Sequence, residues 1–279
     1  SFVVNVGIRT TVECARETRV LWKEGRMKKL GIIVALLVVL ALAACGESTP
    51  PAYGLQFDGV DDQVNAGAFG SYGSMYAAEG TIEFWAKIER AQIYVNYGVV
   101  TSSEEDETNE WGIWTQSWPS PNTQYWVPSF YIADDDGVEL SGYAGGVEID
   151  DSAWHHVAVT WDCETSTIKI YVDGESKTVT YQAQGTPSNF RDFTQNVIVG
   201  GDIWRENLTG ILSDVRVWTT VRTEKEIRDN MEKVLVGNEA GLFAYWRLDE
   251  GSGTTAHDSS PNGHDGTLVG DPVWFTGGD

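Results

Sequence analysis

The stretch Thr81 to Ile88, TIEFWAKI, decides the fold of this chain. Its apolar residues fall at every second position, and side chains two residues apart point to the same face of a β-strand. The alternation therefore predicts a strand that turns one face toward a core. The residues expected on that face are Ile82, Phe84, Ala86 and Ile88, and those expected on the other face are Glu83, Trp85 and Lys87.

Short alternating runs of this kind continue from Gly54 to the end of the chain, separated by Gly, Asp, Asn, Ser and Pro. This organisation is typical of an antiparallel sandwich or barrel. The run 167–172 ends at Asp173-Gly174, which predicts a type I′ hairpin turn. Further strands are predicted near residues 63–65, 98–102, 111–116, 129–133, 155–161, 177–181, 196–200, 210–218, 242–248 and 266–269.

One helix interrupts the strands. Thr223-x-x-Glu226 has the spacing of a capping box, in which the hydroxyl and the carboxylate each accept a hydrogen bond from a free backbone N–H group. Ile227 and Met231 follow at a spacing of four, which puts them on one helix face. The pattern predicts a short helix over 223–233.

The N-terminal part indicates export. Met27-Lys28-Lys29 precedes an apolar run up to Ala44, too short for a spanning helix, as in a signal peptide. The residues Leu42 to Cys45, LAAC, resemble a bacterial lipobox, which implies lipidation of Cys45. Cleavage after Ala44 without lipidation is the alternative. The expected segments are a leader upstream of the start codon (1–26), a signal peptide (27–44), a tether (45–53) and one domain (54–279).

The charge balance argues against several partners. The chain carries 41 acidic and 19 basic residues, a net charge of −22. Removing residues 1–44 takes away seven basic and three acidic residues, so the exported part has a net charge of −26. Such a surface repels phosphate backbones and anionic headgroups. We therefore expect no nucleic-acid partner, and membrane contact only through the lipid on Cys45, with the outer membrane or cell surface as the favoured location.

Several segments resemble the laminin G-like jelly-roll family, which is related to pentraxins and legume-type lectins. They include 55–64 (LQFDGVDDQV), 154–161 (WHHVAVTW), 210–218 (GILSDVRVW) and 241–253 (GLFAYWRLDEGSG). Pro261 stands where the family usually has Gly, but Asn262-Gly263 still suits a turn. The resemblance implies an all-β, two-sheet antiparallel jelly roll of the concanavalin A type, acting as a secreted binding module and expected to be monomeric.

The turn Asp58 to Asp62, DGVDD, is the candidate cation site. Carboxylates at close spacing around a glycine offer the hard oxygen ligands that calcium prefers. The family resemblance implies a further ligand on a late strand, at Asp214. The expected calcium site is therefore formed by Asp58, Gly59, Asp62 and Asp214. The alternative is an acidic turn stabilised by hydrogen bonds to its own backbone.

Three tryptophans are the candidate ligand-binding residues. Trp114, Trp118 and Trp126 lie near Pro119, Pro121 and Pro128 in sequence that resembles loops, where aromatic rings can be exposed. Sugar rings stack on such faces. The alternative is that these rings, like most of the other aromatic residues, fill the core.

No catalytic residue is expected. Glu148-x-Asp150 begins the Glu-x-Asp-x-x-Glu pattern of jelly-roll hydrolases, but Ala153 replaces the second catalytic glutamate. His155 and His156 are adjacent on a predicted strand and point to opposite faces, so they do not form a metal site together.

Three functions follow in decreasing order of support. The first is a non-catalytic, surface-anchored module that binds a glycan or glycoprotein, with a structural calcium. The second is an adhesion or structural surface protein whose partner is another protein. The third is a jelly-roll glycoside hydrolase, which requires a pair of carboxylates about 5 to 9 Å apart in a cleft.

Overall fold

The computed structural model describes residues 49–70, 78–89, 97–102, 110–117, 126–190, 193–202 and 207–277. The chain divides into two units, Ser1–Glu47 and Ser48–Asp279, and all described residues belong to the second. The leader, the signal peptide and Cys45 lie outside the described residues. Within the described ranges, no helix combines the length and the apolar character needed to cross a membrane.

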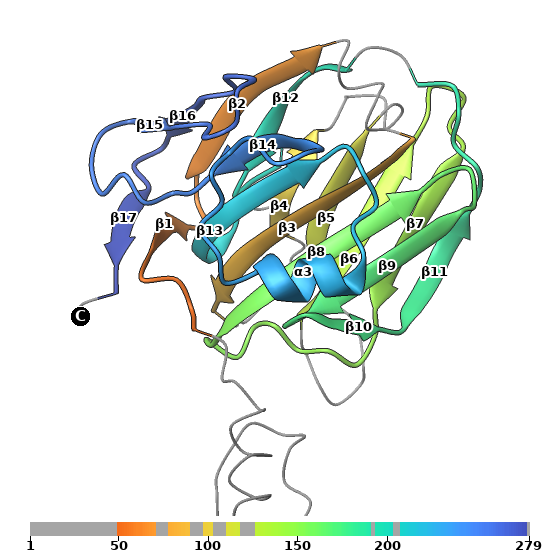
Figure 1. Cartoon of the computed structure of the whole chain (residues 1–279), viewed down its shortest axis with the longest axis horizontal. Helices are drawn as coiled ribbons and strands as arrows, with labels where there is room; N and C mark the ends of the chain where they lie inside the picture. The colour runs from red at the N-terminus through yellow and green to blue at the C-terminus, as the bar shows by residue number, and fades with distance from the viewer. Residues whose placement is uncertain are drawn as a thin grey trace, which may run out of the picture. The chain divides into compact units, whose positions relative to one another are not determined.

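The described strands form two antiparallel sheets that pack face to face (Figure 1). Sheet A has the order β10 (Glu175–Lys177), β9 (Thr167–Val172), β8 (Trp154–Asp162), β3 (Glu79–Ile88), β13 (Thr209–Trp218), β1 (Tyr53–Asp58) and β17 (Val273–Thr276), with β14 (Leu242–Trp246) also paired to β13. Sheet B has the order β11 (Val179–Gln184), β7 (Glu139–Ala144), β6 (Trp126–Ala133), β5 (Trp111–Ser117), β4 (Tyr97–Ser102), β12 (Phe193–Val199), β2 (Gln63–Gly70), β16 (Gly266–Val269) and β15 (Thr255–Ala256). The predicted two-sheet jelly roll is confirmed.

One apolar core fills the space between the sheets. The predicted inner face of β3 is confirmed, because all four of its apolar residues from Ile82 to Ile88 belong to this core. Phe130 of sheet B stacks on Trp161 of sheet A, with ring centroids 4.8 Å apart. Each fully buried large apolar side chain of this kind contributes about 1.5–3 kcal/mol to folding.

The outer face of sheet A is covered by helix α3 (Glu224–Asn230), which lies in front of the sheet in Figure 1. Its capping box is formed as predicted, with Thr223 as the N-cap. The helix ends at Asn230, three residues before the predicted end. Ile227 packs on Ala158 and Tyr171 of sheet A.

Several strands differ from the prediction. The predicted strand at 177–181 is two strands, because the chain leaves sheet A after β10 and enters sheet B as β11. Strands β7, β15 and β17 were not predicted. Most of β7 is buried on both faces, so its sequence lacks an alternating pattern. The turn at Asp173-Gly174 has positive φ at both residues, 54° and 74°, which confirms the predicted type I′ geometry.

Candidate binding surfaces

The turn between β1 and β2 gathers three carboxylates. Asp58, Asp61 and Asp62 each place a carboxylate oxygen within 4.8 Å of the others, and Asp58 and Asp61 are exposed. The Val60 N–H donates to Asp58 Oδ1 at 2.8 Å, which is an Asx turn. Gly59 has a φ of 82°, and a Cβ atom there would lie 2.2 Å from Thr209 Oγ1. The turn therefore requires glycine at this position.

Asp62 fixes the shape of this turn. Its two carboxylate oxygens accept hydrogen bonds from the backbone N–H groups of Asp58 (2.9 Å) and Asp271 (2.8 Å). Burial raises the pKa of Asp62, the two backbone N–H groups oppose this effect, and the nearby Asp58 and Asp61 charges add to it. A cation bound to the three carboxylates would offset this repulsion.

The prediction that Asp214 belongs to this cluster is wrong. Asp58 pairs with Thr209 across β1 and β13, and Asp214 lies five residues further along β13. At a rise of about 3.3 Å per residue, this puts the two aspartates roughly 17 Å apart along the sheet. Asp214 instead accepts hydrogen bonds from Tyr245 and from Arg216. The opening turn and the late strand do not meet at this residue.

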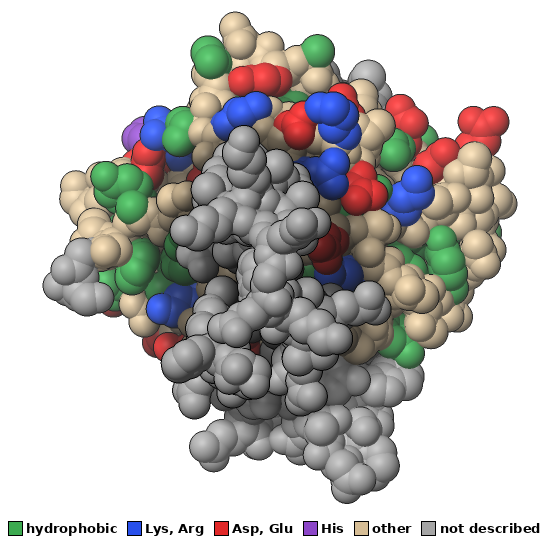
Figure 2. Space-filling view, turned by 60° about the horizontal axis from the view of Figure 1, so that its bottom comes forward, with side chains coloured by type: hydrophobic (Ala, Val, Ile, Leu, Met, Phe, Trp, Pro, Cys, Tyr) green, Lys and Arg blue, Asp and Glu red, His purple; other side chains and the backbone are tan. Residues whose placement is uncertain are grey.

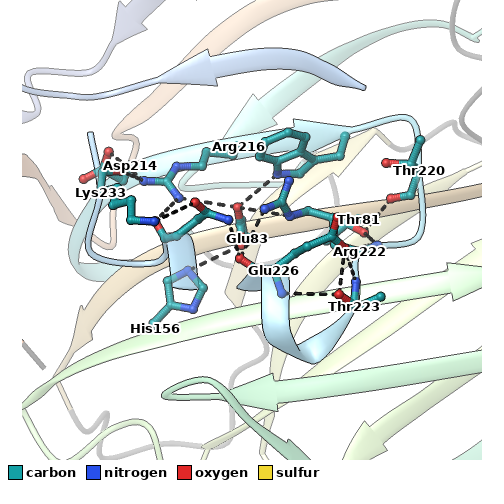
Figure 3. Close-up of polar contacts among 12 residues, drawn as sticks. Thr81, Glu83, His156, Asp214, Arg216, Thr220, Arg222, Thr223, Glu226 and Lys233 are labelled. Atoms are coloured by element: carbon teal, nitrogen blue, oxygen red, sulfur yellow. Dashed lines mark hydrogen bonds and ion pairs between the residues drawn. The ribbon is translucent and has the colours of Figure 1, made fainter. Parts of the chain in front are cut away.

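Asp214 borders a buried polar network on the outer face of sheet A, beneath α3 (Figure 3). Glu83 is fully buried at its centre, and its Oε1 atom accepts from Trp218 Nε1 at 3.0 Å and from Arg216 at 3.4 Å. Arg216 also donates to the carbonyl oxygens of Asn230 (3.1 Å) and Lys233 (2.7 Å). These bonds tie the C-terminal end of α3 to the sheet.

Two further contacts complete the attachment of α3. Trp85 Nε1 donates to the Met231 carbonyl oxygen at 2.7 Å. The Arg222 guanidinium lies over the Trp218 ring, 3.7 Å from its centroid. Trp85 therefore holds α3 directly, and Glu83 holds it through Arg216. Both side chains of β3 are buried because the helix that they attach covers them.

Burial and the neighbouring charges shift the pKa values of His156 and Arg216 in this network. Burial, together with the smaller effect of the Arg216 and Arg222 charges, lowers the pKa of His156 to about 3, so this imidazole is neutral. Burial also disfavours the charged Arg216 guanidinium, but Glu83 and Asp214 hold the pKa of this group above its usual value. Within the described residues, Glu83 Oε2 and His156 Nδ1 have no hydrogen-bond partner.

The prediction that Trp114 is exposed is wrong. Trp114 is a strand residue of β5, its side chain is 2% exposed, and its Nε1 atom donates to Asp202 Oδ2 at 2.5 Å. The ring lies over Gly112, where a Cβ atom would approach it to 2.8 Å. Trp118 lies outside the described residues. Trp126 begins β6, and its side chain is outside the described part.

Trp114 nevertheless marks the outer face of sheet B. Its ring meets that of Tyr131 in a T-shaped contact, with centroids 6.1 Å apart and an interplanar angle of 78°. Tyr131 and Asn65 on this face are half-buried, and Thr267 is exposed. The strand register places a row of outer-face residues side by side across the sheet: Thr267, Asn65, Ile198, Thr101, Gly112, Tyr131 and Ser141.

The residues tested for catalysis have other positions. Glu148 and Asp150 lie in the segment between β7 and β8, so they are not aimed from one strand into a cleft. His155 contacts Asp173 at 2.9 Å and Asp151 at 3.2 Å through its two ring nitrogens. His156 faces Glu83 at 3.7 Å. The two histidines therefore have separate partners, as their alternation predicted.

The buried network beneath α3 was not predicted. The signal that could have found it is the combination of one acidic, one basic and one aromatic residue, Glu83, Arg216 and Trp218, at the outward positions of two paired strands whose inward positions are apolar. A charged pair at such positions is typical of a solvated face, and the sequence does not say that a helix covers it.

A laminin G family model, described as the "Concanavalin A-like lectin/glucanases superfamily", matches residues 58–228, more than half of the chain. A C-reactive protein of Xenopus laevis is 31% identical over 101 residues, covering 34% of this chain and 41% of that protein. The match therefore spans about two-fifths of the length of this curated relative.

Two crystal structures have a similar fold. A proposed carbohydrate-binding protein of Bacteroides ovatus has a TM-score of 0.61 at 20% identity, covering 83% of this chain and 61% of that one. The heptameric SAP-like pentraxin of Limulus polyphemus has a TM-score of 0.53 at 10% identity, covering 81% of this chain and 96% of that one. At these identities the likeness concerns the fold.

Proposed function

Because the chain belongs to the concanavalin A-like lectin/glucanase superfamily, we propose that it is a non-catalytic module that binds carbohydrate, free or on a glycoprotein. The observation that carries this proposal is the outer face of sheet B. On this face Tyr131 and Asn65 are half-buried and Thr267 is exposed, whereas Ile198, Thr101 and Ser141 of the same row are buried. Helix α3, the helix of the described part, lies on sheet A. Aromatic rings and hydroxyl groups are the side chains that bind sugars.

Tyr131 is the expected contact residue on this face. It is half-buried, its ring is held edge-on by Trp114, and Asp202 lies beside Trp114 as a hydrogen-bond acceptor. A ring whose orientation is fixed by packing loses little entropy when a sugar stacks on it. Trp114 therefore supports the binding residue and positions it, which differs from the stacking role expected from the sequence.

The test is a microarray of neutral and acidic oligosaccharides probed with the full chain and with a Tyr131→Ala variant. We expect binding to at least one glycan class, weakened about three- to tenfold by Tyr131→Ala, in line with about 0.5–1.5 kcal/mol for an aromatic contact. Tyr53→Ala, which removes an exposed tyrosine from sheet A, is the matched control and leaves binding unchanged. An absence of binding to any glycan, or equal losses in the two variants, contradicts the proposal.

A bound cation at Asp58, Asp61 and Asp62 is the second part of the proposal. It is supported by three carboxylate oxygens within 4.8 Å, two of them from exposed residues. Calcium should raise the melting temperature of the full chain, because a ligand that binds the native state stabilises it. At a calcium concentration 100 times Kd, the native state gains about 2.7 kcal/mol. Asp61→Asn should abolish this rise, while Asp214→Asn keeps it. A rise that survives Asp61→Asn would place the ion elsewhere.

We also propose that Cys45 is lipidated and anchors the module at the cell surface. The support is the order of basic residues, apolar run and cysteine in the sequence. Expression of the full chain in bacteria grown with labelled palmitate should label the wild type and leave a Cys45→Ala variant unlabelled. Equal labelling of both, or labelling of neither, contradicts this part of the proposal.

The alternative of a protein-binding adhesin would be favoured by a large apolar patch. On the described part of the face in Figure 2, acidic and basic side chains are interspersed, and hydrophobic side chains lie in small separate groups. This face gives the adhesin no specific support.

A further inference from the structure

Helix α3 is short and has a narrow apolar face. Of its seven residues, Ile227 is the buried one, and Met231 follows as the C-cap. A helix of this length is not stable in isolation, so α3 depends on its contacts with sheet A. Those contacts include the bonds that Trp85 and Arg216 donate to carbonyl oxygens at the C-terminal end of the helix and in the turn that follows it. Loss of these bonds would release the segment from Thr219 to Ala240, called the α3 segment below.

His156 lies beneath this segment, next to the bonds that hold it (Figure 3). Its side chain is 1% exposed, and its ring meets the Trp85 ring in a T-shaped contact with centroids 5.4 Å apart. Its Nε2 atom faces Glu83 Oε2 at 3.7 Å, which is beyond hydrogen-bond distance. Its Nδ1 atom has no hydrogen-bond partner among the described residues. Because an imidazolium donates from both ring nitrogens, this position suits the neutral ring.

The charges nearest to His156 are already balanced. Two carboxylates, Glu83 of β3 and Asp214 of β13, face two guanidinium groups, Arg216 of β13 and Arg222 of the α3 segment. A proton on His156 would add a positive charge beside both guanidinium groups in a buried site. Such a charge is costly unless the site opens to solvent.

The other titratable groups around the network have fixed states or partners of their own. They are Asp173, Tyr171 and Tyr245 next to the strands, and Glu226, Lys233 and Glu239 in the α3 segment. The three carboxylates accept hydrogen bonds from backbone N–H groups, and burial raises the pKa of both tyrosines. Glu224 and Arg228, on the solvent side of α3, pair with each other at 3.7 Å. Histidine is the residue of this set that ordinarily changes its charge between pH 5 and pH 8.

From this geometry we infer that His156 is an acid-sensitive switch: protonation of its ring releases the α3 segment from sheet A while the sandwich stays folded. Release hydrates the imidazolium and moves Arg222 away from it. It also uncovers Trp85 and Trp218, so acid would expose aromatic surface on the outer face of sheet A. This switch is independent of what sheet B binds.

The size of the effect follows from the two states of the ring. Burial, with a smaller effect of the Arg216 and Arg222 charges, holds the pKa of His156 at about 3 while α3 is docked. In the released state the ring is solvated, and its pKa returns to the ordinary value near 6.5. The released state therefore binds the proton more tightly. Below about pH 6.5 its population relative to the docked state should rise by about tenfold per pH unit, until about pH 3.

The test is hydrogen–deuterium exchange of the full chain at pH 7.5 and pH 5, corrected for the intrinsic exchange rate of each amide. The reporters are the N–H groups of Ile227 and Met231, which donate within the helix to Thr223 (3.0 Å) and Ile227 (2.9 Å). Opening at these amides should increase by about 30-fold between the two pH values. Amides of β5 and β6 should show a much smaller increase, because the sandwich stays folded.

Two neighbouring histidines provide the variant and its matched control. His156→Gln keeps a polar side chain without a titratable ring, so opening of the α3 segment should change by less than about twofold between the two pH values. His155 contacts Asp151 and Asp173 through its ring instead, and His155→Gln should keep the full response. An NMR titration of the wild-type imidazoles needs no variant: the His156 ring should remain neutral at pH 5 in the docked state.

Several results would overturn the switch. One is an α3 segment whose protection is the same at pH 7.5 and pH 5. Another is an equal increase in the segment and in β5 and β6, which would mean that acid unfolds the whole domain. A full response in His156→Gln, or a lost response in His155→Gln, would remove His156 from the role. If His156→Gln does not fold, a wild-type ring that is charged at pH 5 under a protected α3 segment has the same consequence.

Discussion

The outer faces of the two sheets are built on the same strand geometry and have opposite contents. On sheet A, register places Tyr245, Arg216, Glu83, Ala158 and Tyr171 in one row, and α3 with its flanking segments covers that row. On sheet B, the corresponding row from Thr267 to Ser141 is uncharged. The difference indicates that buried charge on sheet A serves to attach a helix, whereas the row on sheet B, where we propose that carbohydrate binds, contains no charged side chain.

The largest expected effect comes from the centre of the sheet A network. Glu83→Ala removes an acceptor of Arg216 and Trp218, leaves Arg216 with Asp214 alone as its carboxylate, and removes the carboxylate beside the buried Arg222. Breaking a buried ion pair from one side costs about 3–5 kcal/mol, and urea denaturation should measure a loss of this size. Lys169→Ala, an exposed change on the same sheet, is the control. A loss below about 1 kcal/mol for Glu83→Ala would mean that the network does not hold α3.

A matched pair of tryptophan variants separates the two faces. Trp85→Phe removes the bond to the Met231 carbonyl oxygen, and Trp114→Phe removes the bond to Asp202. Each should lower the free energy of unfolding by about 1–2 kcal/mol, the cost of an unsatisfied buried partner. Only Trp114→Phe should weaken glycan binding, as measured on the microarray. Weakened binding in Trp85→Phe with none in Trp114→Phe would reverse the roles of the faces.

The pH dependence of stability is a smaller test of sheet A. Burial, followed by the Arg216 and Arg222 charges, lowers the folded-state pKa of His156 to about 3, whereas the unfolded chain has its usual value near 6.5. As pH falls through 6.5, the unfolded state gains a proton that the folded state does not bind, so stability falls until about pH 3. The wild type should therefore lose more stability between pH 7 and pH 5 than His156→Phe. Parallel losses in the two proteins would show that this imidazole is not held neutral.

The smallest effect is expected on the solvent side of α3. Lys225 and Asp229 form an exposed ion pair at a spacing of four residues. Such pairs contribute about 0.3–0.5 kcal/mol, so Lys225→Ala should change the free energy of unfolding by no more than this amount. A loss comparable to that of Glu83→Ala would place the attachment of α3 on its exposed side.

The sequence predicted the inner face of the sandwich well, because hydropathy alternation records which side chains meet the core. For Ile82 to Ile88 this was enough. The same pattern could not show that Glu83 and Trp85 are buried too, since a residue opposite the core can face either water or a covering helix. The cover depends on where α3 docks, which is a long-range contact.

In the candidate site, too, local neighbours were predicted correctly and long-range neighbours were not. Asp58 and Asp62 were correctly placed together, because they lie four residues apart in one turn. Asp214 was misplaced because its position relative to Asp58 depends on the register of β1 on β13. Trp114 was expected to be exposed because of its proline-rich neighbourhood, although it falls within the strand predicted at 111–116; β5 continues to Ser117 and the Trp114 side chain is buried.

Hydrogen–deuterium exchange of the full chain, with and without the glycan that binds most strongly on the microarray, tests the central claim most directly. A ligand on the outer face of sheet B should slow exchange in β5 and β6, around Trp114 and Tyr131, and leave the segment from Thr219 to Ala240 unchanged. Slowed exchange in that segment, with β5 and β6 unchanged, would place the ligand on sheet A and contradict the account.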